Sequence, residues 1–287
     1  MDVILSKYFG PCCGVSRAFE TSMKIDSDVK ILGDIAHNKI LIDKLKNKKN
    51  IKVVKRVSEI CNNDFVVIRT HGITIDDMIE LEKKKCKITD LTCCNVKFVQ
   101  KIAEKAEKEG KILILAGYIF HSEVIGISSR CKHTFVVNSV ESTKNLISVI
   151  KFDHRQIIVA SQTTFDHNKF VDICDFLKSK FNNIEIYDTI CNDSYKRRDE
   201  LKRISCFIDY CIVIGDKNSS NSMRLFEFSK NFCKSSIIEN PKSLDVSILD
   251  GIKRLFITSG ASVLKETVLE LVNNIKKNRE IEIKKVV

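Results

Sequence analysis

The stretch Ile88-Thr89-Asp90-Leu91-Thr92-Cys93 (residues 88–93) runs from a short apolar segment through an aspartate to a cysteine, and the pattern recurs at Ile186-Tyr187-Asp188-Thr189-Ile190-Cys191. In both stretches the cysteine comes three residues after the aspartate, and an amphipathic pattern typical of a helix follows. Cys12 likewise follows an apolar start and precedes a helical segment that begins near Gly14. The three cysteines are 81 and 98 residues apart, which indicates three similar α/β units that each contribute one thiol to a common centre.

Short apolar runs rich in β-branched residues alternate with lysine-rich periodic stretches along the chain. The runs have the length of buried parallel strands, and they lie at 64–69, 111–116, 156–160, 184–187, 210–215 and 254–258. Apolar residues at three- and four-residue spacing predict helices between them, over 96–108, 168–181, 195–208, 222–232 and 263–277. Because the 287 residues include only 2 Pro and 10 Gly, a tight-turned all-β sandwich is disfavoured. We therefore predict an α/β fold of three small units with parallel sheets, over residues 1–94, 95–192 and 193–287.

Polar residues follow five of the predicted strands. In open parallel sheets, ligands bind beyond the carboxyl ends of the strands, where the next helix presents unpaired N–H groups. We therefore expect these loops to face a ligand, although Ser, Thr and Asn are also ordinary helix N-caps. The loops lie at 70–72, 117–123, 161–164, 218–221 and 259–262.

The composition limits the classes of protein that the chain can represent. Its formal charge of +11 comes from basic residues interspersed with acidic ones, which favours a solvated surface over a nucleic-acid-binding face. The first residues lack a basic segment followed by an apolar stretch, and no apolar run approaches the ~18 residues needed to cross a bilayer. We therefore expect a protein of the reducing cytoplasm, without a membrane partner, whose 12 cysteines are free thiols.

Cys12, Cys93 and Cys191 are the candidate metal ligands. Each lies at a predicted strand-to-helix junction, where the dipole of the helix N-terminus favours a thiolate. No C-x-x-C pair is present, which disfavours a zinc ribbon or a ferredoxin-type run. Three single thiolates from distant loops can instead hold a cubane cluster and leave its fourth iron open to substrate. We assign no role to the cysteines at 61, 86, 131, 174, 206, 211 and 233, which are interpreted as small apolar or surface residues.

Several further motifs stand in a specific order along nearly the whole chain: Cys12-Cys13-Gly14-Val15, His37-Asn38, His71-Gly72, Asp90-Leu91-Thr92-Cys93, His121-Ser122-Glu123-Val124, Gln162-Thr163-Thr164, Cys191, Asn218-Ser219-Ser220-Asn221-Ser222 and Gly260-Ala261-Ser262. In this order and spacing they resemble the 4-hydroxy-3-methylbut-2-enyl diphosphate reductases of the non-mevalonate isoprenoid pathway. The resemblance implies three α/β units in a pseudo-threefold trefoil around a central cluster cavity. It also implies reductive removal of the allylic hydroxyl to give isopentenyl and dimethylallyl diphosphates, with two electrons from ferredoxin or flavodoxin.

The resemblance also implies roles for single residues. Cys12, Cys93 and Cys191 match the three ligands of a 4Fe-4S cluster with one open iron. Glu123 and Thr163 match a proton-delivery pair near the substrate hydroxyl, and His121 is expected to act with them. The residues expected to bind the substrate, mainly through its diphosphate, are His37, His71, His121, Thr163, Ser219, Ser220, Asn221 and Ser262.

The chain departs from the family pattern after the third thiol. Asn192-Asp193-Ser194 stands where the family prefers a small residue followed by threonine. A carboxylate at Asp193 either lowers the reduction potential of the cluster or points away from it.

Two other functions are compatible with parts of the sequence. His121-Ser122-Glu123 matches the H-x-E half of a zinc deaminase signature, which would make the chain a zinc hydrolase, but no P-C-x-x-C follows it. The basic charge is also compatible with a nucleic-acid-binding protein that has structural cysteines. That alternative lacks a recognition motif, interleaved aromatic residues and a concentrated basic face.

Overall fold

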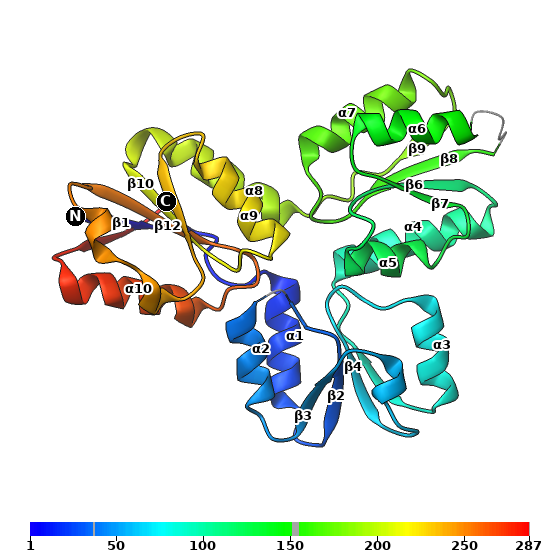
Figure 1. Cartoon of the computed structure of the whole chain (residues 1–287), viewed down its shortest axis with the longest axis horizontal. Coiled ribbons are helices and arrows are strands. Elements are labelled where there is room, and N and C mark those ends of the chain that lie inside the picture. The colour runs from blue at the N-terminus through cyan, green and yellow to red at the C-terminus, as the bar shows by residue number, and fades with distance from the viewer. Residues whose placement is uncertain (37, 151–154, 287) are drawn as a thin grey trace. The chain divides into compact units, whose positions relative to one another are not determined.

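The computed structural model describes residues 1–36, 38–150 and 155–286 (Figure 1). Its strands form three separate sheets, and the strands within each sheet are parallel. The predicted α/β class with three parallel-sheet units is therefore confirmed. The chain divides into two compact units, unit 1 with Met1–Met23, Ala36–Lys48 and Asn192–Val287, and unit 2 with Lys24–Ile35 and Lys49–Cys191.

The three sheets share one order of four strands, to which sheet A adds β13 at its edge. Sheet B, in unit 2, has the order β3 (Ile51–Val54), β2 (Val29–Leu32), β4 (Phe65–Ile68), β5 (Lys87–Asp90). Sheet C, also in unit 2, has the order β7 (Thr134–Val137), β6 (Ile112–Ala116), β8 (Ile157–Ser161), β9 (Ile184–Ile186). Sheet A, in unit 1, has the order β11 (Lys234–Ile238), β10 (Tyr210–Ile214), β12 (Arg254–Ser259), β1 (Asp2–Leu5), β13 (Glu282–Lys285).

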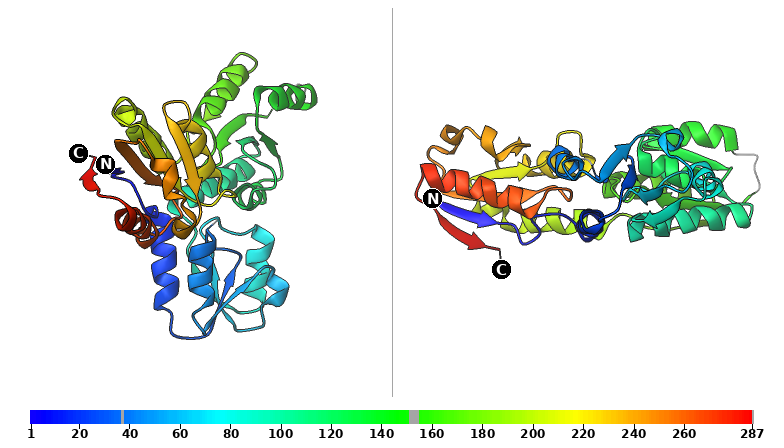
Figure 2. Two further views of the ribbon diagram at one scale, coloured as in Figure 1. Left: turned by 60° about the vertical axis from the view of Figure 1, so that its left-hand side comes forward. Right: turned by 90° about the horizontal axis from the view of Figure 1, so that it is seen from below.

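The first strand of the chain occupies the place in sheet A that β5 and β9 occupy in sheets B and C. Strand β1 pairs with β12 on one side and with β13 on the other, so the two ends of the chain run side by side (Figure 2). Val3 and Leu5 are buried in the core of sheet A, which explains why this short apolar segment pairs there. The interval 1–94 that the sequence suggests for the first unit therefore includes a strand of sheet A. The other predicted boundaries stay a prediction.

Helices connect the strands and cover the sheets. Five of them match the helices predicted from the sequence, with ends that differ by a few residues: α4 (Cys94–Lys108), α7 (His167–Lys178), α8 (Asn192–Ile204), α9 (Ser220–Ser229) and α10 (Lys265–Asn278). The helical segment expected from near Gly14 is α1 (Cys13–Lys24). The described part of the chain adds α2 (Lys39–Lys46), α3 (Ile75–Lys83), α5 (Ser122–Ser128) and α6 (Val140–Ile150). Single 3₁₀ turns lie at η1 (Val57–Glu59), η2 (Ser205–Phe207), η3 (Pro241–Ser243) and η4 (Val246–Leu249).

Sheet C illustrates why its strands are apolar at every position. Ile112, Ile114 and Ala116 of β6 pack with residues of α6 and α7, and the intervening Leu113 and Leu115 pack with residues of α4 and α5. Figure 1 shows these two pairs of helices on opposite faces of sheet C. A parallel strand covered by helices on both faces has no solvent-exposed side. Its sequence is therefore a continuous apolar run, and the carboxyl ends of the strands are left as the place for polar loops.

In the described part of the chain, no helix is both long enough and apolar enough to cross a membrane. None of the 12 cysteines, all of which fall in the described ranges, forms a disulfide.

Candidate active site

Cys93 and Cys191, both in unit 2, lie at equivalent places in sheets B and C. The amide of Cys93 donates to the carbonyl oxygen of Thr70 over 2.9 Å, just beyond β4, and the amide of Cys191 donates to the carbonyl oxygen of Thr163 over 2.7 Å, just beyond β8. These bonds prolong the parallel pairing of β5 with β4 and of β9 with β8. The neighbouring strand therefore fixes the backbone that carries each thiol.

The aspartate of the repeated sequence pattern forms the turn before each thiol. Oδ1 of Asp90 accepts hydrogen bonds from the amide of Thr92 (2.9 Å) and from its hydroxyl (2.5 Å), and Oδ1 of Asp188 accepts from the amide of Ile190 (3.2 Å). An aspartate that binds the amide two residues later makes an Asx turn, which ends a strand. The repeat in the sequence is thus a repeat of local structure.

Asn95 connects the segments around the two thiols of unit 2. It lies in the first turn of α4, for which Cys93 is the N-cap, and its Nδ2 donates to Sγ of Cys191 over 3.2 Å. A thiolate attracts the N–H side of an amide and repels its oxygen, so the donor orientation is the favourable one. Sequence analysis missed Asn95 because 96 residues separate it from Cys191.

Glu123 and Thr163 form a buried pair in unit 2. Oε1 of Glu123 accepts from the amide of Thr163 over 2.6 Å, and Oε2 lies 2.9 Å from the Thr163 hydroxyl. Glu123 is only 1% exposed, and this burial raises its pKa to about 7 although the two hydrogen bonds from Thr163 oppose the rise. The carboxyl group can therefore hold or release a proton near neutral pH.

His121 stands at the start of the helix that carries Glu123. It is the N-cap of α5, and its Nδ1 accepts from the amide of Glu123 over 3.2 Å. In the neutral imidazole the proton then lies on Nε2, which makes that nitrogen a donor. The ring of His71, in the loop after β4, meets the ring of His121 edge to face with centroids 5.4 Å apart. The structure thus brings these two predicted histidines together, whereas His37 lies outside the described residues.

Cys12, in unit 1, has the same backbone setting as the other two thiols. It follows β1, and its amide donates to the carbonyl oxygen of Ala261 over 2.9 Å, just beyond the neighbouring strand β12. Ser262, the next residue of that loop, is largely buried, with 7% of its surface exposed. One thiol and one predicted substrate-binding serine therefore lie at neighbouring strand ends of sheet A.

The serine and asparagine residues after β10 form the start of α9, also in unit 1. Ser219 is the N-cap of α9, and its Oγ accepts from the amide of Ser222 over 3.4 Å. The Ser194 hydroxyl, on α8, donates to Oδ1 of Asn221. Because Oδ1 is occupied in this way, Nδ2 of Asn221 is left to donate elsewhere. Sequence analysis missed this role of Ser194, and the side chain of Ser220 lies outside the described part of the structure.

Two glycines allow α9 to approach the ends of β10 and β12 closely. A Cβ atom on Gly215 would lie 2.3 Å from Oγ of Ser222, and one on Gly260 would lie 2.0 Å from the same atom. Any larger residue at either position would push against α9. Ser222 is fully buried between them, and its hydroxyl has no hydrogen-bond partner among the described residues.

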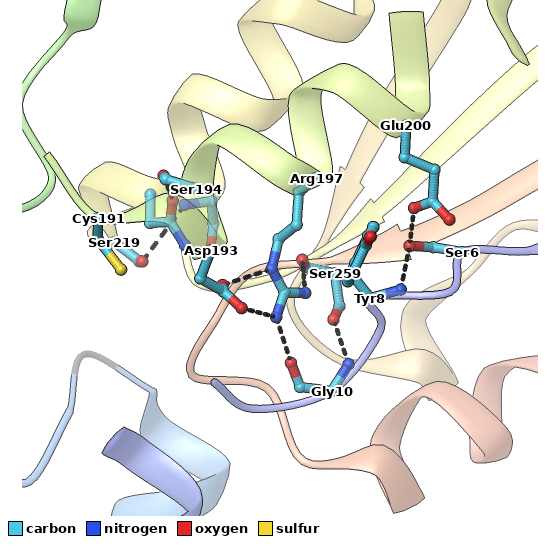
Figure 3. Close-up of polar contacts among 12 residues, drawn as sticks. Ser6, Tyr8, Gly10, Cys191, Asp193, Ser194, Arg197, Glu200, Ser219 and Ser259 are labelled. Carbon is cyan, nitrogen blue, oxygen red and sulfur yellow. Dashed lines mark hydrogen bonds and ion pairs between the residues drawn. The ribbon is translucent and has the colours of Figure 1, made fainter. Parts of the chain in front are cut away.

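Asp193, the departure from the family pattern, pairs with a cation on its own helix. Its carboxylate accepts from Nε of Arg197 over 2.8 Å, one turn later on α8 (Figure 3). Of the two alternatives that the sequence leaves open for this side chain, the contact favours a carboxylate that is turned away from the thiol and neutralised by Arg197.

The donor set has the chemistry that an iron–sulfur cluster requires. The three thiols stand immediately before helices α1, α4 and α8, and cysteine sulfurs are the usual ligands of iron–sulfur clusters. Among the described residues, no group of three His, Cys, Asp or Glu side chains is arranged to hold a metal ion. The three-thiol centre therefore stays a prediction.

The fold and the site together define an α/β protein in which each of three parallel sheets carries a thiol beyond its strands. The chain belongs to the LytB family, because the family described as LytB protein matches residues 3–276.

The similar proteins are named as reductases. A relative from a Nitratiruptor species, named 4-hydroxy-3-methylbut-2-enyl diphosphate reductase, is 34% identical over 278 residues, covering 96% of this chain and 99% of the relative. A relative of the same name from Campylobacter hominis is 36% identical over 277 residues, covering 96% and 98%. The solved structure of E-1-hydroxy-2-methyl-but-2-enyl-4-diphosphate reductase from Plasmodium falciparum has a TM-score of 0.89 at 26% identity, covering 100% of this chain and 92% of that one.

Proposed function

We propose that the chain converts 4-hydroxy-3-methylbut-2-enyl diphosphate to isopentenyl and dimethylallyl diphosphates by reductive removal of the allylic hydroxyl. One observation carries the proposal: Cys191, Thr163 and Glu123 form a connected series. The amide of Cys191 binds the Thr163 carbonyl, and Thr163 in turn binds the Glu123 carboxyl group through its own amide and hydroxyl. In a LytB-family chain, this series puts a buried proton source next to a candidate metal ligand.

The proposed cofactor is a 4Fe-4S cluster held by Cys12, Cys93 and Cys191. When bound, it would supply the two electrons, received from ferredoxin or flavodoxin, and a Lewis-acidic iron that is open to substrate. The equivalent backbone settings of the three thiols support this ligand set, as does the absence of disulfides among the twelve cysteines. Free thiols also agree with the reducing cytoplasm expected from the sequence.

Glu123 and Thr163 would deliver the proton that lets the hydroxyl leave. The overall change adds two electrons and two protons to the substrate and releases one water. Because Glu123 is buried behind Thr163, the proton passes from the carboxyl group to Oγ1 of Thr163 while the threonine hydroxyl gives its own proton to the leaving oxygen. A carboxyl group with a pKa of about 7 suits this step at neutral pH.

Several of the predicted hydrogen-bond donors would bind the diphosphate. The imidazole of His121 would donate from Nε2, and the amide of Asn221 would donate from Nδ2. Ser219 and Ser262 add hydroxyl donors at the carboxyl edge of sheet A, where the N-terminus of α9 also attracts an anion. His37, His71 and Ser220 complete the proposed set.

The proposal is tested with protein purified without oxygen. We expect about four irons and four sulfides per chain, and formation of both C5 diphosphates from the substrate with a chemical reductant. Cys93→Ser and Cys191→Ser should lose most of the iron. Cys206→Ser is the matched control, because Cys206 is an exposed cysteine outside the proposed ligand set.

Other outcomes would point elsewhere. A colourless protein with one zinc per chain would favour the deaminase alternative, and tight oligonucleotide binding at high salt would favour the nucleic-acid alternative. An iron-loaded protein that leaves the diphosphate unchanged would refute the substrate.

A further inference from the structure

We infer that helix α8 acts as a clamp on the segment of residues 6–12, and that Arg197 and Glu200 are positioning residues for the Cys12 thiol. The inference rests on the proposed function only in taking Cys12 as a cluster ligand. Both clamp residues and the segment that they hold belong to unit 1. Arg197 and its partner Gly10 are 187 residues apart in the sequence, so no local pattern predicts the contact.

Arg197 holds the end of the segment nearest to Cys12. Its guanidinium is almost fully buried, with 3% of the side chain exposed, and it donates from Nη2 to the carbonyl oxygen of Gly10 over 2.9 Å. Nη1 donates to the carbonyl oxygen of Ser259 over 2.9 Å, and Nε donates to Asp193 (Figure 3). One side chain thus ties the Cys12 segment to the end of β12, and Asp193 balances its charge.

Glu200 holds the other end of the segment. It lies three residues after Arg197 on α8 and is 1% exposed. Its Oε2 accepts from the Ser6 hydroxyl over 2.5 Å, and its Oε1 accepts from the amide of Lys7 over 2.6 Å (Figure 3). Ser6 also connects Glu200 to Tyr8, because its Oγ accepts from the amide of Tyr8 over 3.1 Å.

Two further hydrogen bonds hold the segment to the end of β12 and the loop that follows it. The amide of Gly10 donates to Oγ of Ser259 over 2.9 Å, and the amide of Cys12 donates to the carbonyl oxygen of Ala261 over 2.9 Å. Gly10 has a φ of +95°, and a Cβ there would lie 2.6 Å from the Lys265 side chain, so this turn requires glycine. Contacts within unit 1 therefore define the path of the segment.

Burying two opposite charges on one face of a helix is costly unless each has bonding partners. A structural role alone would be served as well by apolar residues at these positions. Here the charged groups bind backbone atoms of the segment before Cys12, at Lys7 and at Gly10. We conclude that the two charges are used to hold this segment in one conformation, ready to present its thiol.

The test is hydrogen–deuterium exchange of the full-length chain, in the iron-free and the iron-loaded forms. Arg197→Met should speed exchange of the Gly10 and Cys12 amides at least tenfold, and Glu200→Ala should do the same for Lys7 and Tyr8. Arg203→Met is the matched control, because Arg203 pairs with Asp199 at the same four-residue spacing but is 60% exposed. The control should leave all four amides protected.

A second readout follows the metal. We expect a chelator to remove iron from the loaded Arg197→Met and Glu200→Ala proteins at least three times faster than from the unchanged protein and from Arg203→Met. If Arg197→Met does not fold, Arg197→Lys replaces it, since lysine keeps the charge and reaches one of the two carbonyl oxygens; partial loss of protection is then expected.

The two proposals can fail separately. Unchanged protection of residues 7–12 in both the Arg197 and the Glu200 variants overturns the clamp, whatever the activity of the protein. Loss of protection in the control variant overturns it as well. If the exchange pattern is as expected and the unchanged, iron-loaded protein does not reduce the diphosphate, the clamp stands and the proposed function falls.

Discussion

Glu123 is the residue whose protonation controls the proposed reaction. Burial raises its pKa from the usual 4.5 to about 7, so the carboxyl group is mainly protonated below that pH and mainly ionised above it. If Glu123 supplies the proton, kcat should be constant at low pH and fall tenfold per pH unit well above 7. The measurement is kcat against pH with a reductant whose own potential is corrected for pH.

Glu123→Gln removes the proton but keeps the shape of the side chain. We expect iron content to stay unchanged and kcat to fall by about 10² to 10⁴. A variant that retains turnover would remove Glu123 from this role.

The same pKa has a consequence for stability. Because the folded-state pKa lies above the unfolded value, Glu123 favours the folded state at low pH, and this contribution is lost as pH rises from 4.5 through 7. Relative to the unchanged protein, Glu123→Gln should therefore gain unfolding free energy between pH 5 and pH 8. Urea unfolding of both proteins at the two pH values measures the difference. A relative loss of unfolding free energy in Glu123→Gln over this range would contradict a carboxyl group that is buried and protonated.

Asn95 is expected to tune the proposed cluster through its bond to the Cys191 sulfur. A hydrogen bond to a ligand sulfur stabilises the reduced, more negative cluster and so raises its potential. Asn95→Leu should lower the midpoint potential, and Asn95→Asp should lower it further because it adds a negative charge. Redox titration followed by electron paramagnetic resonance gives both values, and equal potentials in all three proteins would exclude the effect.

The sequence predicts the residues of the site that belong to local motifs and misses those that act across long distances in the chain. Cys93, Glu123 and their neighbours are recognisable because each stands in a short pattern. Arg197 and Glu200 lie in an ordinary charged helix, and their partners Gly10 and Ser6 are 187 and 194 residues away. Only the fold reveals such pairs.

At the scale of elements, each sheet has the same arrangement of residues at three strand ends. The strands of the three repeats, in order, are β2 to β5, β6 to β9, and β10 to β12 followed by β1. The helix after the first strand of each repeat begins with a side-chain cap: Asn38 for α2, His121 for α5 and Ser219 for α9. A predicted substrate-binding residue follows the third strand, and a thiol follows the fourth. The proposed site is therefore one arrangement of strand ends used three times with different side chains.

The close approach of α9 to sheet A can be tested by adding one methyl group. Gly260→Ala would put a Cβ against Oγ of Ser222, and we expect a loss of about 1–3 kcal/mol in the free energy of unfolding. Diphosphate binding should also weaken, because Ser219 and Asn221 move with α9. Urea unfolding and substrate KM measure the two effects.

The double variant Gly260→Ala with Ser222→Gly supplies the control. It leaves the new Cβ at an ordinary contact distance of 3.5 Å from Cα of residue 222, so most of the lost stability attributable to the clash should return. If the double variant is no more stable than Gly260→Ala, the clash with Ser222 is not the cause.

The sequence identifies central strands better than edge strands. The predicted strands β4, β6, β8, β10 and β12 lie inside their sheets, where burial on both faces requires continuous apolar runs. Strands β7 and β11 lie at edges and are half-buried, with polar residues such as Thr134 and Lys234, so their composition does not distinguish them from loops. Strand β9 is an exception, because its isoleucines mark it although it lies at an edge. Strand β2 is the opposite exception, because it lies inside sheet B but Lys30 interrupts its apolar run and the sequence does not predict it.

At the scale of the whole molecule, β1 completes the third repeat although it is the first strand of the chain. The repeats therefore follow one another in order only in a circular permutation of the chain. Opening the chain between Asp26 and Ser27, both exposed, and joining Val287 to Met1 through a Gly/Ser linker of about ten residues would make every repeat continuous. We expect this permuted chain to fold, to bind iron as before and to refold faster, because the sequence separation of β1 and β12 falls. Refolding from urea and iron content measure both, and a permuted chain that does not fold would refute the equivalence of the repeats.

The pairing of β1 with β12 also has a consequence for folding during synthesis on the ribosome. Gly10 and its partner Ser259 are 249 positions apart, and a ribosome adding roughly 5–20 residues per second needs about 12 to 50 seconds to make the intervening chain. Sheets B and C can form during that time, while β1 still lacks its pairing partners β12 and β13. The segment that carries Cys12, a proposed cluster ligand, therefore reaches its place in sheet A only after β12 has been made.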